Sequence, residues 1–153
     1  QIFSCSALRY AKEYVLTAED LEEVGNIEYI DAYTMKSWKK YAVHLIDPVI
    51  KNYLYEQLIE DIRTVKIRDK TSVSVQWDNR VISRFNTFEQ TKTPMKIDIY
   101  GSAGNKSIIF KDTFFAFKSA LNAFVVTCFE KKENRYSFDY LEKVVKIIQE
   151  GMK

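Results

Sequence analysis

The sequence predicts an α+β domain, an antiparallel strand meander of four or five strands flanked by N-terminal and C-terminal helices. Hydrophobic residues recur at spacings of three and four in the first part of the chain and again after residue 112. Between residues 64 and 111 they alternate with polar residues instead. Because helical and strand patterns are segregated, we expect the helices to pack on one face of an antiparallel sheet.

The chain is interpreted as a single domain covering residues 1–153, of which residues 1–15 are weakly patterned and are expected to form an arm or a short helix. A chain of 153 residues has the usual length of one domain and can bury a core without metals or disulfides. The composition of 46% hydrophobic and 29% charged residues excludes intrinsic disorder.

Two helices are expected after this arm. Thr17 and Asp20 have the spacing of a capping box, and Gly25 follows as a residue that commonly ends helices. A second helix is predicted over residues 31–46 from apolar side chains at helical spacing. Those side chains are Trp38, Tyr41 and Leu45.

A third helix is predicted to begin at Asp47 and Pro48, because Asp caps helices and Pro tolerates the first turn. In this helix Glu56 and Glu60 would lie one turn apart, where a carboxylate pair can hold Mg²⁺ or transfer protons. Solvated surface charge is the more ordinary interpretation of such a pair. The apolar face would contain Ile50, Leu54, Leu58 and Ile62.

The alternating region divides into strands at turn-forming residues. Asp78 and Asn79 predict a two-residue turn. A four-residue loop over 101–104 would place Ile97 opposite Ile108. The predicted strands cover residues 64–68, 72–77, 80–88, 95–100 and 107–111.

Two helices close the chain, the first capped by Asp112 or Thr113 and the second by Ser137. We expect the first of them to cover the apolar side of the sheet, with Cys128 buried as a small hydrophobic residue. Its apolar stripe comprises Phe114, Phe117, Leu121, Phe124, Val125 and Cys128.

The first hairpin carries a candidate nucleic-acid surface. With the predicted turn, Trp77, Arg80 and Arg84 would share one face, and Lys66 and Arg68 would lie on the neighbouring strand. Aromatic rings beside cations can stack on bases and contact phosphates. A cation–π pair on a solvated sheet face explains the same pattern, and the net charge of +2 is small for a nucleic-acid binder.

Tyr29, Tyr33 and Trp38 are candidates for contact with a protein partner or a second copy, because exposed aromatic residues suit such surfaces. The alternative is that they border the core. His44 is the single histidine, with Asp47 one helical turn away, and no nucleophile or metal-ligand motif accompanies the pair. No catalytic residue, metal or cofactor is therefore predicted.

Cys5 and Cys128 are far apart in sequence and predict unpaired thiols in a reducing, intracellular compartment. The leading functional hypothesis is a non-catalytic protein-interaction or assembly domain that binds a protein partner or self-associates. The alternative is a nucleic-acid-binding domain that uses the basic and aromatic hairpin face. The third hypothesis is an enzyme of unknown class.

Overall fold

The computed structural model of the chain describes residues 5–129 and 137–153. Its strands are β1 (Ile27–Thr34), β2 (Ile59–Ile67), β3 (Lys70–Trp77), β4 (Ile82–Thr87), β5 (Lys96–Gly101) and β6 (Asn105–Ile109). Its α-helices are α1 (Ala18–Val24), α2 (Trp38–Tyr41), α3 (Val43–Tyr53), α4 (Thr113–Phe129) and α5 (Phe138–Glu150). Two 3-10 turns, η1 (Ala7–Tyr10) and η2 (Lys12–Tyr14), precede them.

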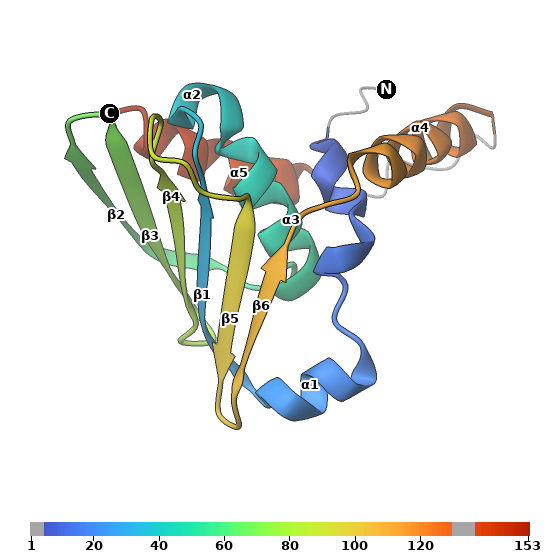
Figure 1. Cartoon of the computed structure of the whole chain (residues 1–153), viewed down its shortest axis with the longest axis horizontal. Helices are drawn as coiled ribbons and strands as arrows, with labels where there is room; N and C mark the ends of the chain where they lie inside the picture. Colours follow the sequence, from blue (N-terminus) through green and yellow to red (C-terminus); the bar gives the residue numbers. More distant parts are fainter. Residues whose placement is uncertain (1–4, 130–136) are drawn as a thin grey trace.

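The strands form one six-stranded mixed sheet in the order β2-β3-β4-β1-β5-β6, with α3 and α5 on one of its faces (Figure 1). β1 pairs with β4 in parallel, whereas the other neighbours are antiparallel. The predicted antiparallel meander is therefore wrong, because it left out the strand that lies at the centre of the sheet.

That central strand, β1, replaces the first part of the helix predicted over residues 31–46. Ile30, Ala32 and Thr34 are buried and alternate with the half-buried Tyr29 and Tyr33, which is the period of a strand. The helical prediction is wrong for residues 31–34 because the helical spacing of apolar residues begins only at Trp38 and does not include the strand before it. The helix begins at Trp38.

The third predicted helix is displaced towards the N-terminus. Pro48 lies inside α3 and does not begin a new helix, and the chain leaves the helix at Leu54. Residues 59–67 then form β2, so Glu56 and Glu60 do not lie one helical turn apart. Both are exposed, and the Glu60 carboxylate accepts a hydrogen bond of 2.8 Å from Gln76.

The β3–β4 hairpin has a different register from the predicted one. Arg80 adopts a positive φ of 69°, and the Trp77 amide donates to the Val81 carbonyl, so Val75 pairs with Ser83. A slip of one residue moves a side chain to the opposite face of a sheet. Trp77 is fully buried under the helices, whereas Arg84 lies exposed on the other face.

Several local predictions are confirmed. Thr17 and Asp20 form a complete capping box, and α1 ends at Gly25 with φ of 72°. Ile97 pairs with Ile108 across the second hairpin, and the Ser137 side chain accepts from the amide of Tyr140. Each of these depends on contacts between residues that are near in sequence.

The helical layer over the sheet differs from the prediction. α3 and α5 cover the sheet, whereas α4 packs on η1 and lies apart from the strands (Figure 1). The Trp38 indole donates to the Ile148 carbonyl at 2.9 Å and packs on Gly151, which fixes the end of α5. Within residues 5–129 and 137–153, no helix is long and apolar enough to cross a membrane.

Candidate functional site

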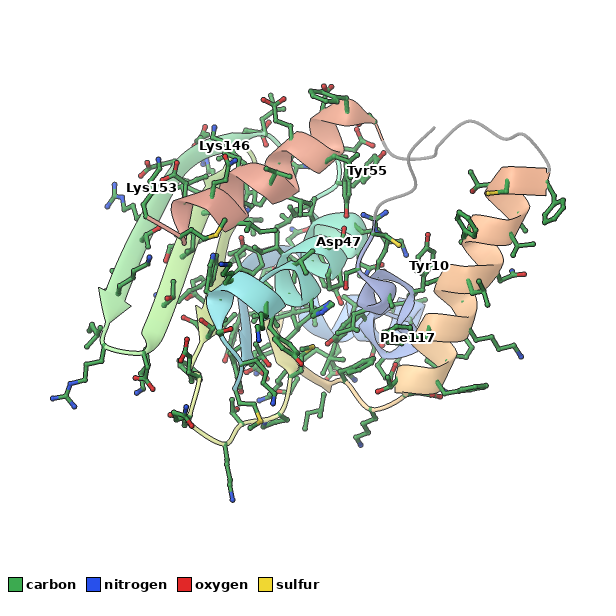
Figure 2. All side chains as sticks on the ribbon, turned by 90° about the horizontal axis from the view of Figure 1, so that it is seen from above. Tyr10, Asp47, Tyr55, Phe117, Lys146 and Lys153 are labelled. Atoms are coloured by element: carbon green, nitrogen blue, oxygen red, sulfur yellow. The ribbon has the colours of Figure 1, made fainter. Side chains whose placement is uncertain are left out.

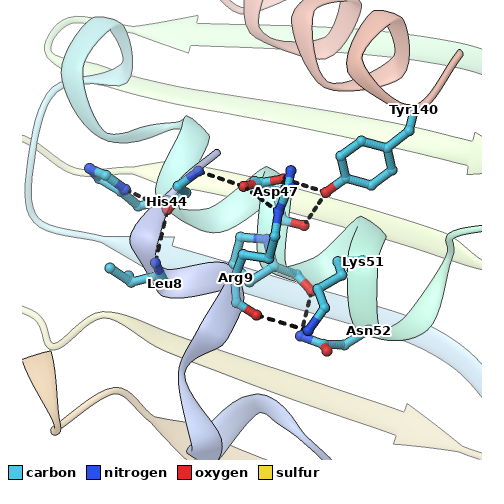
Figure 3. A network of polar contacts seen from close by, with 9 residues as sticks. Leu8, Arg9, His44, Asp47, Lys51, Asn52 and Tyr140 are labelled. Atoms are coloured by element: carbon cyan, nitrogen blue, oxygen red, sulfur yellow. Dashed lines mark hydrogen bonds and ion pairs between the residues drawn. The ribbon is translucent and has the colours of Figure 1, made fainter. Parts of the chain in front are cut away.

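A buried carboxylate in the middle of α3 accepts hydrogen bonds from two other parts of the chain, the N-terminal segment and α5 (Figure 3). Asp47 is 1% exposed and accepts a hydrogen bond of 2.7 Å from the backbone amide of Ser6. The guanidinium of Arg9 donates to both carboxylate oxygens, with Nε 3.1 Å from each, and Nη2 adds a further contact. Tyr140 donates its hydroxyl to Asp47 from α5.

This network compensates the cost of burying a charge. An isolated buried carboxylate is strongly unfavourable, and a guanidinium that binds both oxygens supplies the opposite charge and directional hydrogen bonds. Arg9, 1% exposed, also stacks on the Tyr140 ring with Cζ 4.8 Å from the ring centroid. Asp47 therefore joins η1, α3 and α5 into one rigid unit.

His44 lies one helical turn before Asp47 and contacts the same N-terminal segment. Its Nδ1 is 2.8 Å from the Ser6 hydroxyl, which also accepts from the Leu8 amide at 3.2 Å. The Tyr41 ring packs edge-on at 5.5 Å between ring centroids. Among the residues that the structure describes, none hydrogen-bonds to Nε2, and the side chain is half-buried. The ring is thus held at Nδ1, while Nε2 has no hydrogen-bond partner among the described residues.

The surroundings shift several ionisation equilibria. Burial lowers the pKa of His44, and the charge of Asp47 opposes this effect only in part, so the imidazole is neutral at pH 7. Burial and the Asp47 charge raise the pKa of Tyr140, which keeps its hydroxyl a donor. Burial and the nearby Arg9 lower the pKa of Lys51, whose ammonium donates to the Arg9 carbonyl. The site therefore combines a neutral base with a fixed ion pair.

The structure separates the residues of the predicted nucleic-acid surface. Trp77 is buried on the helix-covered face and donates to Ser83 at 2.9 Å, whereas Arg84 lies 5.7 Å from the Tyr29 ring on the opposite face. Arg80 and Arg68 occupy positive-φ turn positions, and Lys66 is exposed on β2. The side chains needed on one face thus lie on two faces and in turns.

The predicted protein-contact residues are also divided. Tyr29 and Tyr33 are half-buried on the sheet face that carries no helix. Trp38 is 5% exposed and packs inside the helical layer, so it presents no contact surface. Cys128 is exposed although it was expected to be buried, and Cys5 is half-buried with its pKa raised by burial.

Sequence reasoning considered His44 and Asp47 but missed Ser6, Arg9 and Tyr140. Ser6 and Arg9 fall in the segment interpreted as an arm, and Tyr140 is far along the chain. The clearest available signal was Asp47 itself, an acidic residue between Ile46 and Pro48 on an apolar helix face, which requires a buried cation.

The described part of the chain offers no group of three or more metal-ligating side chains. The sequence also contains no glycine-rich turn of the form G-x-G-x-x-G, the usual dinucleotide fingerprint. The four glycines are Gly25, Gly101, Gly104 and Gly151.

Comparison with solved structures identifies proteins that share the fold. Myo-inositol 2-dehydrogenase from Lactobacillus plantarum superimposes with a TM-score of 0.72 at 17% identity, over 97% of this chain and 61% of that one. An oxidoreductase from Thermotoga maritima gives 0.70 at 13% identity, over 96% and 58%. Scyllo-inositol dehydrogenase from Lactobacillus casei, with bound NAD(H) and scyllo-inositol, gives 0.64 at 13% identity, over 96% and 58%.

The chain thus spans about three-fifths of the length of these similar structures. No family model matches it, and no curated protein is similar to it in sequence. These matches contradict the interaction-domain and nucleic-acid hypotheses, because the fold recurs in dehydrogenases. No local motif in the sequence indicates this fold.

Proposed function

We propose that this chain forms the substrate-facing part of an oxidoreductase that oxidises an alcohol of a polyhydroxylated substrate, with His44 as the proton acceptor. The observation that carries the proposal is a half-buried imidazole held at Nδ1 by Ser6, with no hydrogen-bond partner at Nε2 among the described residues. It occurs in a fold whose similar structures include inositol dehydrogenases.

The chemistry requires a base. When an alcohol becomes a ketone, the carbon loses a hydride and the oxygen loses a proton. A bound nicotinamide dinucleotide would take the hydride, and His44 would take the proton. A proton acceptor must be in its neutral form, and burial, which lowers the pKa of His44, favours the neutral imidazole.

The contact with Ser6 fits the tautomer that this role needs. In that tautomer Nδ1–H donates to the Ser6 hydroxyl oxygen, and the lone pair on Nε2 is left for the substrate proton. After transfer the imidazolium is stabilised by the charge of Asp47, which lies one turn further along α3. Ser6 and Asp47 are thus positioning residues, and His44 is the residue that would contact the reacting hydroxyl.

The similar structures also indicate the substrate class. Their names specify myo-inositol, scyllo-inositol and UDP-N-acetylglucosamine, all of which carry secondary alcohols on a ring. The dinucleotide-binding residues are not supplied by a glycine fingerprint in this sequence. The proposal therefore concerns the substrate side of the reaction.

NMR of the single imidazole tests this role directly, because one histidine gives one unambiguous signal. Saturating myo-inositol, scyllo-inositol or UDP-N-acetylglucosamine should shift the His44 nitrogen resonances, and Ser6→Ala should change the tautomer ratio. NAD⁺-dependent oxidation of the binding compound should fall at least ~100-fold in His44→Gln and remain unchanged in Lys66→Gln, which alters an exposed residue on β2. Unmoved imidazole signals with every compound, or full turnover in His44→Gln, would refute the proposal.

A further inference from the structure

The face of the sheet opposite α3 and α5 carries a hollow near β2. Within the described part of the chain, α5 packs along one face of β2 and β3, and no helix lies over the other (Figure 2). The hollow has a volume of about 290 Å³, close to the lower end of the ~300–1,000 Å³ typical of small-molecule sites. The side chains that line it include Tyr29, Arg63, Ser74, Gln76, Ile82 and Arg84.

Strand pairing places two arginines on either side of a serine. Arg63 of β2 is opposite Ser74 of β3, and Ser74 is opposite Arg84 of β4. Neighbouring strands lie about 4.8 Å apart, so the backbones of the two arginines are separated by roughly 10 Å, with the short serine between them. Two long side chains that flank a short one leave the space of the hollow, with an arginine on each side.

The Arg63 guanidinium is held at one nitrogen. Its Nε donates to the Asp61 carboxylate at 2.8 Å, and this carboxylate also accepts from the Ile62 amide at 2.9 Å. Among the described residues, none accepts a hydrogen bond from either Nη group. Because Asp61 uses Nε, the two Nη groups of Arg63 remain as donors for a ligand.

The Arg84 guanidinium is less neutralised than that of Arg63. Its Cζ lies 5.7 Å from the centroid of the Tyr29 ring, which is a cation–π contact. In residues 5–129 and 137–153, no carboxylate forms an ion pair with it. Asp31, the next residue in the same row, is close enough to interact with its charge but accepts its hydrogen bond from Asn86. Arg84 therefore keeps its N–H donors for a ligand.

The adjacent row of the sheet offers contacts for a carbon chain or ring that carries hydroxyl groups. Gln76 is opposite Ile82, and Ile82 is opposite Tyr29. The Gln76 amide nitrogen donates to Glu60 at 2.8 Å, which leaves the amide oxygen as an acceptor for a hydroxyl. Ile82 is 41% exposed, and the Tyr29 ring is half-buried. The two side chains thus supply apolar surface for C–H groups.

We propose that this hollow binds a small phosphorylated polyol, with the phosphoryl group between Arg63 and Arg84 and over Ser74. A phosphoryl group carries about two negative charges and three acceptor oxygens, and guanidinium groups bind such oxygens in pairs. The lining contributes two guanidiniums and one carboxylate, so its charge favours an anion. The hollow lies on the sheet face opposite α3, which carries His44, so this site is separate from the proposed proton acceptor.

Isothermal titration calorimetry with glucose 6-phosphate and glycerol 3-phosphate tests the site. We expect at least one of them to bind with a Kd below ~1 mM, inorganic phosphate to bind at least ~5-fold more weakly, and glucose and glycerol not to bind. Arg84→Gln should weaken binding at least ~10-fold, the effect of losing a hydrogen bond to a charged group. Lys66→Gln is the matched control, because it removes the same charge from an exposed β2 residue outside the lining. This control should change Kd less than about two-fold.

Ser74→Leu distinguishes a defined site from general attraction to positive charge. Leucine would fill the space between the two arginines without changing the net charge, so binding should be lost. In the unmodified chain, the bound ester should shift the backbone amide resonance of Ser74 in NMR spectra and leave the His44 ring signals unmoved. Absence of binding with both esters, undiminished binding in Ser74→Leu or Arg84→Gln, or an unmoved Ser74 amide would overturn the proposal. Because these readouts do not depend on His44, this site and the proposed function fail separately.

Discussion

Replacing Asp47 by Asn should destabilise the protein more than any conservative change at the surface. The two carboxylate oxygens of Asp47 accept from Arg9, Tyr140 and the Ser6 amide. An Asn side chain has only one acceptor oxygen, and its NH₂ group would face these donors. It also removes the carboxylate charge that pairs with Arg9, 1% exposed, in the folded protein.

The magnitude follows from this burial. Breaking a buried ion pair by removing one partner costs about 3–5 kcal/mol. Since a domain of this size loses about 2–4 °C in Tm per kcal/mol, Asp47→Asn should lower Tm by roughly 6–20 °C. The loss is a large part of the ~5–15 kcal/mol that usually stabilises a folded domain.

Urea unfolding followed by far-UV circular dichroism and tryptophan fluorescence measures this loss. Asp61→Asn is the matched control, because Asp61 pairs with Arg63 at 2.8 Å but their side chains are 48% and 82% exposed. The control should change the free energy of unfolding by less than about 1 kcal/mol. Equal losses for both variants, or a loss below ~1 kcal/mol for Asp47→Asn, would refute the reasoning.

Two further predictions concern His44 and Gly151. Because the folded pKa of His44 lies below its unfolded value of 6.5, the unfolded state binds more protons. Stability should therefore fall as pH drops below 6.5, and His44→Gln should flatten this part of the profile in urea titrations at several pH values. Gly151→Ala should cost about 1–3 kcal/mol by thermal unfolding, because its Cβ would lie 2.1 Å from the Trp38 ring. An unchanged Tm in Gly151→Ala would show that the Trp38 ring moves aside without cost. A pH dependence of stability that persists in His44→Gln would mean that a group other than His44 causes it.

The local elements of the fold follow from sequence because their determinants are local. Thr17 and Asp20 cap α1, Ser137 caps α5, and Ile97 pairs with Ile108, each through neighbours in one helix or hairpin. His44 and Asp47 were recognised as a pair because residues three positions apart lie on the same face of a helix.

Strand β1 and the β3–β4 register were decided by the tertiary structure. A segment such as residues 27–34, flanked on both sides by helices, gains its strand conformation by pairing with β4 and β5, partners more than forty residues away. The positive φ of Arg80 lengthened the hairpin loop and moved Trp77 and Arg84 to opposite faces. The spacing of hydrophobic residues alone predicts neither the strand nor the register.

The sequence by itself determined which stretches are apolar and where several helices begin and end. Only the tertiary structure decided that Asp47 is buried against Arg9 and Tyr140, that α3 and α5 cover the sheet in place of α4, and that α4 turns its Phe residues outwards. The physical reason is that capping and periodicity act within a few residues, whereas partner choice and layer order depend on packing across the whole chain.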